Sequence, residues 1–378
     1  MKKSLNIGIV GYGLNSVMLK NELEKHPLLK GKTKLIVGYD PNAEAKERLK
    51  KLSGVKVANT FEDLLDTPGL EAVLIVSPPK FHATQAISAL ESGKHVFSEI
   101  PMALKIRNLE KIIQAVEESG KIYQLGENYC FIPEVLFAGF LASSGKIGTT
   151  VYAESEYLHD ITYRWRKGFH GDVNVPRINS WYQDFDPLMY GHTIGPAQVA
   201  LGGLKNPTPF IEVVSYANDL SGYQGNPICS PAKAFQVALF KTENDSIAKC
   251  VNAYIVAREP PRISIQVIGN IGTYECYQIG SPGRLFIAED HKISKTRHRK
   301  GHKQIIDKEM LSKTIPQIQG EYYGATIRIL NDWLSAIKFN KQPSINARKG
   351  ANFCAAGIAA SKSARSGGKK IKIKNFLN

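Results

Sequence analysis

The first forty residues constrain the fold of this chain more than any other segment. An apolar run, Ile7-Gly8-Ile9-Val10, leads directly into a glycine turn at Gly11 and Gly13, and a second apolar run over 35–39 ends at Asp40. A strand, a glycine turn, a helix and a second strand tipped by a carboxylate form the unit that binds a dinucleotide. The chain is therefore predicted to begin with a nucleotide-binding α/β unit.

Each part of this unit has a physical task. Gly11 permits the tight turn, Gly13 lets the backbone approach a pyrophosphate, and the helix that follows offers N–H groups to the phosphates. Ser16 replaces the third glycine of the usual pattern. Asp40 is expected to accept hydrogen bonds from the adenosine ribose and to repel a 2′-phosphate, so NAD is favoured over NADP.

Length and composition exclude several classes of protein. A chain of 378 residues is too long for one ordinary core, and its 43% hydrophobic and 22% charged residues are typical of a soluble globular protein. No run approaches the ~20 apolar residues that span a bilayer, and the N-terminus lacks a signal-peptide pattern. We expect a cytoplasmic protein without a membrane segment. The five scattered cysteines show no ligand spacing, so neither disulfides nor a metal site is expected.

The net charge of +15 raises the question of nucleic-acid binding. Two segments, 292–303 and 369–374, are strongly basic, but lysines are spread over the whole chain and no nucleic-acid motif accompanies them. A solvated basic surface is the favoured interpretation, attraction of an anionic substrate is the alternative, and no nucleic-acid partner is expected. The 292–303 segment is predicted to be an exposed loop or hairpin.

Residues 1–126 alternate between strand and helix patterns, which predicts a doubly wound parallel sheet with its ligand beyond the carboxyl ends of the strands. From about residue 150 the pattern becomes a series of two-period strands, which predicts a large, mostly antiparallel open sheet within a second α/β domain. The expected domains are 1–126, which binds NAD, and 127–378, which binds substrate and carries the oligomer contacts. Further strands are expected at 55–57, 72–76, 95–97, 122–125, 150–158, 212–216, 234–240, 248–255 and 263–268, and helices at 43–51, 82–90, 108–119, 134–143, 323–339 and 347–366.

Several motifs, in order along the chain, resemble the Gfo/Idh/MocA family of NAD(P)-dependent oxidoreductases. Besides the glycine turn they include Val76-Ser-Pro-Pro79 with His82, Gly93-Lys-His-Val-Phe-Ser-Glu-Ile-Pro101, Gly126-Glu-Asn-Tyr129 and Ser363-Ala-Arg-Ser-Gly-Gly368. The resemblance implies a Rossmann domain followed by an α/β domain whose open sheet forms a homodimer or homotetramer. Together with the strand ends, it gives the expected cofactor contacts: Gly11, Gly13, Leu14, Asn15, Asp40, Ser77, Pro78, His82, Glu99 and Asn128.

Two departures from the family pattern affect catalysis. Ile100 stands where the family has the lysine of Glu-Lys-Pro, and isoleucine has neither a donor nor a titratable proton. The family places an Asp four residues before a catalytic His, whereas His192 has Leu188 at that position and Asp186 two residues further back.

A subgroup of the family that includes the NAD-dependent glycosidases of glycoside hydrolase family 109 carries segments similar to those around Tyr157 and His192. We expect His192 to be the general acid/base, because imidazole titrates near neutrality, and Tyr157 to be a second proton carrier. A buried structural histidine and a packing tyrosine are the alternatives for these two residues. Expected substrate contacts are His159, Tyr190, Trp165 and Arg166. For His159 the alternative is pairing with Asp160 or with backbone, and for the other three residues it is simple packing.

Three functions follow from these residues. The favoured hypothesis is an NAD-dependent oxidoreductase that dehydrogenates a small carbohydrate-like substrate: a sugar, a cyclitol or a sugar derivative. The second is an NAD-dependent glycosidase working by transient oxidation and elimination, for which the missing lysine would matter less. The third is a catalytically inactive NAD-binding protein, which Ile100 and the displaced Asp favour.

Overall fold

The computed structural model describes residues 4–160, 186–218, 233–254, 256–290 and 297–377. The chain forms two compact units. Unit 1 comprises residues 1–127 and 326–354, and unit 2 comprises residues 128–325 and 355–378. The domain boundary expected at 126/127 lies beside the first change of unit, but segment 326–354 returns to unit 1.

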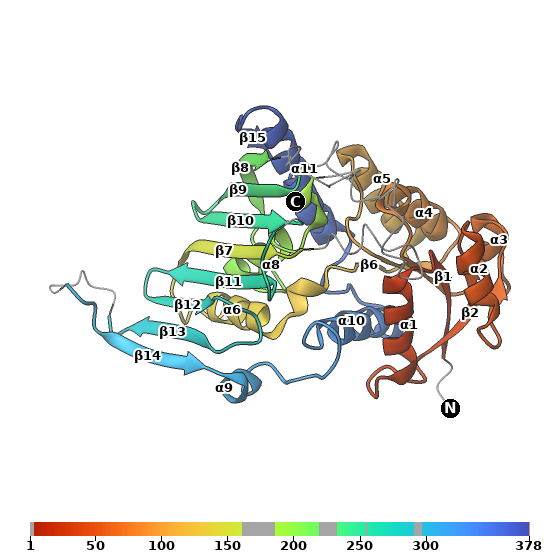
Figure 1. Ribbon diagram of the computed structural model, residues 1–378, viewed down its shortest axis with the longest axis horizontal. Coiled ribbons are helices and arrows are strands. Elements are labelled where there is room, and N and C mark those ends of the chain that lie inside the picture. The colour runs from red at the N-terminus through yellow and green to blue at the C-terminus, as the bar shows by residue number, and fades with distance from the viewer. Residues whose placement is uncertain (1–3, 161–185, 219–232, 255, 291–296, 378) are drawn as a thin grey trace. The chain divides into compact units, whose positions relative to one another are not determined.

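Unit 1 is built on a six-stranded sheet with the order β3-β2-β1-β4-β5-β6, and every strand pair in it is parallel. This order is that of a dinucleotide-binding doubly wound fold, as the sequence predicted. Helices α4 and α5 lie side by side in this unit (Figure 1). The strands are β1 (Leu5–Val10), β2 (Thr33–Tyr39), β3 (Lys56–Val57), β4 (Ala72–Ile75), β5 (His95–Ser98) and β6 (Tyr123–Leu125). The helices between them are α1 (Leu14–Lys25), α2 (Ala43–Lys50), α3 (Phe61–Leu65), α4 (Pro79–Glu91) and α5 (Ile106–Ser119).

Local chemistry fixes the ends of these elements. Thr60 begins α3 with a capping box, in which its hydroxyl accepts from the Asp63 N–H and the Asp63 carboxylate accepts from the Thr60 N–H.

The segment 326–354, which returns to unit 1, packs on the same sheet, because Trp333 of α10 (Ala325–Phe339) is fully buried with its ring 5.6 Å from that of Phe97. These contacts explain why residues 326–354 belong to unit 1.

Unit 2 is built on a nine-stranded sheet with the order β14-β13-β12-β11-β7-β10-β9-β8-β15. Among the described strand pairs of this nine-stranded sheet, only β7–β10 is parallel. The expected large, mostly antiparallel sheet is thus confirmed. Its strands are β7 (Thr150–Leu158), β8 (Phe210–Asn218), β9 (Phe235–Thr242), β10 (Ile247–Ala253), β11 (Arg262–Gly269), β12 (Gly272–Cys276), β13 (Gly283–Ala288), β14 (Gly301–Ile306) and β15 (Ile371–Lys372). The helical elements are η1 (Asn128–Phe131), α6 (Pro133–Ser143), η3 (Pro187–Tyr190), α8 (Ile194–Gly202), α9 (Lys308–Ser312) and the second half of α11 (Ala347–Arg365).

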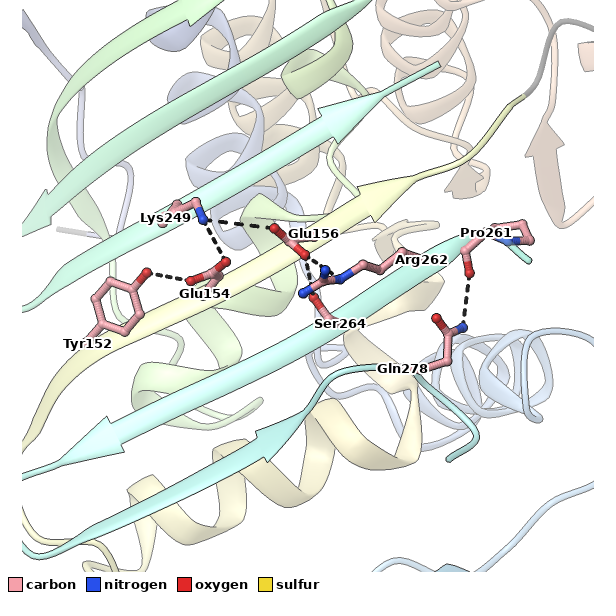
Figure 2. A network of polar contacts seen from close by, with 8 residues as sticks. All are labelled: Tyr152, Glu154, Glu156, Lys249, Pro261, Arg262, Ser264 and Gln278. Atoms are coloured by element: carbon pink, nitrogen blue, oxygen red, sulfur yellow. Dashed lines mark hydrogen bonds and ion pairs between the residues drawn. The ribbon is translucent and has the colours of Figure 1, made fainter. Parts of the chain in front are cut away.

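The two faces of this sheet differ. Helices α6 and α8 pack on one face, against β7, β10 and β11. The other face carries a network of ion pairs and hydrogen bonds (Figure 2), in which Lys249 contacts Glu154 at 2.8 Å and Arg262 contacts Glu156 at 2.7 Å. Burial alone would raise the pKa of Glu154, but hydrogen bonds from Lys249 and Tyr152 lower it overall.

Three further expectations can be compared with the structure. The described cysteines, Cys130, Cys250, Cys276 and Cys354, are buried thiols. Among the described residues no helix is long and apolar enough to cross a bilayer. Of the basic segment 292–303, residues 297–300 are exposed and 301–303 begin β14, which pairs with β13 as a hairpin; residues 291–296 lie outside the described ranges.

Candidate active site

The glycine turn at the end of β1 has the geometry that a nucleotide-binding loop needs. Gly11 has φ of 82°, and a Cβ added there would lie 2.7 Å from the Val76 carbonyl oxygen at the end of β4. Ser16 is fully buried, and its hydroxyl donates to the Gly11 carbonyl at 2.5 Å. The serine therefore ties α1 to the turn, where the usual pattern has a third glycine.

Asp40 is held beside this turn by backbone hydrogen bonds. One carboxylate oxygen accepts the Tyr12 N–H at 2.7 Å, and the other accepts the Asn42 N–H at 2.8 Å. Arg48 lies next to them, since its guanidinium donates to the Tyr12 carbonyl at 2.6 Å. A carboxylate has about four lone-pair sites, so Asp40 retains acceptor capacity for a pair of ribose hydroxyls.

His82, an expected cofactor contact, has backbone carbonyls beside both ring nitrogens. Its Nδ1 lies 2.9 Å from the Pro101 carbonyl oxygen and its Nε2 lies 2.6 Å from the Ser77 carbonyl oxygen. Burial lowers the pKa of this imidazole. Both ring nitrogens of His82 thus lie beside backbone carbonyls, one in the loop after β4 and one in the loop after β5.

The remaining expected cofactor residues lie at the ends of strands and starts of helices. Gly13 is the N-cap of α1, Leu14 is its exposed first residue and Asn15 follows. Ser77 follows β4 and donates to Gln85, and Pro78 is the N-cap of α4. Glu99 follows β5 directly, and Asn128 begins η1. Ile100, at the position of the family lysine, is 5% exposed, which gives the site an apolar group there.

In unit 2, the imidazole of His192 lies within a cluster of tyrosine rings. The Tyr129 ring stacks on it with centroids 3.8 Å apart and an interplanar angle of 19°. Tyr190 and Tyr157 meet it edge-on, with centroids 4.5 Å and 5.2 Å away. The Tyr157 hydroxyl lies 2.8 Å from Nδ1 of His159. We call Tyr129, Tyr157, His159, Tyr190 and His192 the aromatic cluster.

Three elements bring this cluster together. Tyr157 stands near the end of β7 and His159 two residues later, which gives both side chains the same direction. Tyr129 belongs to η1, and Tyr190 ends η3. Gly191 then takes a φ of 97°, which turns the chain so that His192 follows before α8.

The cluster combines imidazole and phenol groups with aromatic surfaces. An imidazole and a phenol can move protons to or from a hydroxyl, and aromatic rings offer stacking faces to an apolar ring surface. His192 is 8% exposed and Tyr157 6% exposed, so the protein shields both from bulk water. No group of described residues has the donors to hold a metal ion.

Sequence reasoning and structure agree only in part on the members of this site. His192, Tyr157, His159 and Tyr190 come together, whereas Trp165 and Arg166 lie outside the described residues. Sequence reasoning missed Tyr129 as a site residue, although it stood in one of the family-like motifs directly after β6. Tyr254, with its ring 6.0 Å from that of Tyr190, was missed because nothing in the alternation of β10 marks it.

The displaced acidic residue, Asp186, has another partner. Its carboxylate is fully buried and accepts two hydrogen bonds from Arg365, at 2.6 and 2.8 Å. It therefore does not substitute for the family's Asp as a partner of the imidazole.

Comparison with known proteins supports the interpretation of unit 1. Residues 5–127 match the model of the oxidoreductase family with an NAD-binding Rossmann fold. A glycosyl hydrolase family 109 protein of Shewanella baltica is 30% identical over 111 residues, which are 29% of this chain and 24% of that protein. The chain thus matches only about a quarter of the length of this curated relative.

Solved structures show the same fold over the whole chain. An oxidoreductase domain protein from Kribbella flavida superposes with a TM-score of 0.80 at 19% identity, over 99% of this chain and 100% of that one. A levoglucosan dehydrogenase in complex with NADH and levoglucosan has a TM-score of 0.76 at 18% identity, over 98% and 100% of the two chains. The glycine turn and the strand order agree with this family match, which covers residues 5–127 and describes an NAD-binding Rossmann fold.

Proposed function

We propose that this protein is an NAD-dependent dehydrogenase of a sugar, a cyclitol or a sugar derivative. The observation that carries the proposal is the pairing of His192 with Tyr157 in a shielded aromatic cluster of a chain whose first unit is an NAD-binding fold. The levoglucosan dehydrogenase that shares the fold acts on a sugar derivative, which supports this substrate class.

In this proposal the protein supplies proton transfer and orientation. When bound, NAD supplies the hydride acceptor. His192 takes the proton from the substrate hydroxyl as its carbon loses hydride, and Tyr157 is the second proton carrier, backed by Nδ1 of His159. Tyr190 offers a face to the substrate ring, and Trp165 and Arg166 are proposed as further substrate contacts. Ile100 takes no part in proton transfer.

The dehydrogenase proposal is tested by NADH formation across a panel of sugars, cyclitols and sugar derivatives. We expect turnover with at least one class, and His192→Gln should lower kcat about 100-fold or more, in the range of lost acid/base catalysis. The dissociation constant for NAD should stay unchanged, and His302→Gln, on exposed β14, is the matched control. Tight NAD binding without turnover by the unaltered protein would instead identify an inactive NAD-binding protein.

For the cofactor we propose NAD rather than NADP, held by Gly11, Gly13, Leu14, Asn15, Asp40, Ser77, Pro78, His82, Glu99 and Asn128. Asp40 carries this preference, because its carboxylate accepts ribose hydroxyls and repels a 2′-phosphate. In Asp40→Ser we expect the ratio of NADP to NAD dissociation constants to fall at least tenfold, measured by titration calorimetry. Asp66→Ser, at the C-cap of α3, is the control. Equal affinity of the unaltered protein for both nucleotides would contradict this assignment.

A second candidate function is redox-neutral cleavage of a glycoside, in which transient oxidation of a ring hydroxyl acidifies the neighbouring C–H. The buried Ile100 in place of the family lysine and the glycosyl hydrolase family 109 relative favour it. Release of nitrophenol from nitrophenyl glycosides with catalytic NAD, and without net NADH formation, would establish this function in place of net oxidation.

We also propose that the protein forms a homodimer or homotetramer through the open face of its nine-stranded sheet. Strand register places several exposed apolar side chains on that face together with the network of Figure 2. They are Tyr216, Leu239, Ile247 and Ile305. A monomer that left all of them in water would expose an unusual apolar area for one sheet face.

A further inference from the structure

We propose that Asp186 is a positioning residue that acts with Arg365 and Ser361 to fix the turn carrying Tyr190 and His192. This inference rests on the proposed function, because it assigns to Asp186 a role in the same site. It replaces the role of imidazole partner that the family pattern would give to an acidic residue near this position.

The Asp186 carboxylate is connected on both oxygens. Oδ2 accepts from the Ser361 hydroxyl at 2.5 Å and from Nε of Arg365 at 2.8 Å. Oδ1 accepts from a terminal nitrogen of Arg365 at 2.6 Å and from the Lys233 N–H at 3.2 Å. Two parallel charged hydrogen bonds to one guanidinium fix direction as well as distance. Asp186 is thereby tied to the last turns of α11.

The residues after Asp186 are tied to two strands. The Pro187 carbonyl accepts from Asn252 at 2.7 Å and from the Tyr254 hydroxyl at 3.2 Å, both in or next to β10. The Leu188 N–H donates to the Gln236 side chain of β9 at 3.0 Å. The backbone from 186 to 188 therefore has partners on α11, β9 and β10 immediately before the site residues.

Close packing of α11 restricts the backbone conformations available to this turn. A Cβ added at Gly357 would lie 2.8 Å from the Leu188 carbonyl oxygen, so the helix approaches the turn at backbone distance. Tyr190 follows Leu188 by two residues, and His192 comes directly after Gly191, whose backbone is left-handed. An acid/base group must be held within a fraction of an ångström of its working place, so an anchor six residues away affects the reaction without contacting the substrate.

The test compares a charge-free pair variant with conservative and control variants of the full-length chain. Asp186→Asn with Arg365→Gln removes the ion pair without leaving a buried charge unpaired. Ser361→Ala removes one hydrogen bond and takes the place of the pair variant in the test if the pair variant does not fold. Arg365→Lys is the conservative variant. Arg348→Gln is the matched control, since Arg348 lies on the same helix, is also 45% exposed and pairs with Glu117 at 2.6 Å.

Hydrogen exchange measured by mass spectrometry and steady-state kinetics give separate readouts. In the pair variant we expect the amides of 188–193 to exchange at least tenfold faster, and His192 to react faster with diethylpyrocarbonate. We expect kcat to fall at least tenfold while the dissociation constant for NAD changes less than twofold. Ser361→Ala should show a smaller change in the same direction, and Arg365→Lys should recover part of kcat. Arg348→Gln should behave as the unaltered protein.

The outcomes separate this inference from the dehydrogenase proposal. Unchanged exchange at 188–193 and unchanged kcat in the pair variant overturn the inference, and turnover by the unaltered protein still supports the dehydrogenase proposal. Faster exchange with unchanged kcat shows an anchor without a positioning role and also overturns it. If no substrate is turned over, the dehydrogenase proposal fails, and faster exchange together with faster modification of His192 still supports the positioning role.

Discussion

The stacking of Tyr129 on His192 is the closest ring contact in the aromatic cluster, and its contribution can be measured by substitution. Aromatic pairs contribute about 0.5–1.5 kcal/mol beyond the area they bury. Tyr129→Leu removes the ring, so we expect a stability loss of about 1–3 kcal/mol together with a kcat lowered about tenfold. Tyr129→Phe keeps the ring and should leave kcat within about threefold of the unaltered value. Urea unfolding and steady-state kinetics supply the two measurements, and a kcat equally low in both variants would show that the hydroxyl matters instead of the stack.

At the scale of single residues, the sequence indicates candidate residues for a chemical role, but it does not show which partners their side chains contact. Gly11 has a left-handed backbone and Asp40 accepts the Tyr12 N–H beside it, while their roles toward a dinucleotide stay predictions. His82 stays a prediction as a cofactor contact, and only the three-dimensional structure shows that both its nitrogens face backbone carbonyls. Asp186 could not be interpreted from sequence either, since its partner Arg365 is 179 positions away.

Strand β5 contains a titratable group that makes the stability of unit 1 depend on pH. His95 accepts the Ile122 N–H on Nδ1 at 2.9 Å, and burial, with Lys121 nearby, lowers the pKa of its imidazole to about 4. The unfolded chain binds this proton near pH 6.5, whereas the folded chain resists it down to about pH 4. His95 therefore contributes stability above pH 6.5 that is lost as the pH falls towards 4.

We expect His95→Asn to remove this dependence, because the asparagine oxygen replaces the acceptor and does not titrate. The difference in Tm between the two proteins should be constant above about pH 7, should move in favour of the variant between about pH 6.5 and 4, and should level off below. Thermal unfolding monitored by circular dichroism across this range gives the comparison. A constant difference throughout would mean that the folded protein binds the proton as readily as the unfolded chain.

At the scale of elements, the agreement is closest where strands are buried on both faces. β4 reads as a continuous apolar run, and it lies at the centre of the parallel sheet with all four residues buried. In unit 2, the alternation of apolar and polar residues predicted where the strands lie along the chain but not which strands they pair with. The same alternation suits a parallel and an antiparallel neighbour, so the parallel β7–β10 pair could not be predicted. Nor does any local pattern show that 326–354 returns to unit 1.

At the scale of the whole molecule, the unequal faces of the nine-stranded sheet bear on assembly. Register places Leu239 opposite Lys249, and Ile247 lies on the same face two residues before that lysine. The neighbouring Lys249 and Arg262 are paired with Glu154 and Glu156, so the charges there are already neutralised within the chain. An apolar surface around neutralised charges is suited to burial against another protein surface, because few charges would lose partners on association.

If the open face is the contact between copies, one charge placed at its apolar part should separate them. Leu239 is 51% exposed. A leucine that an interface buries fully contributes about 1.5–3 kcal/mol, and a glutamate there would add the cost of an unpaired charge. In a twofold contact each substitution acts twice. We therefore expect Leu239→Glu to weaken association at least 100-fold and to yield monomers at micromolar concentration. Leu28→Glu, at a residue that is 45% exposed in unit 1, should keep the mass of the unaltered protein. Sedimentation equilibrium of the three proteins decides the matter: a monomeric unaltered protein, or a Leu239→Glu variant of unchanged mass, would place the contact elsewhere or exclude it.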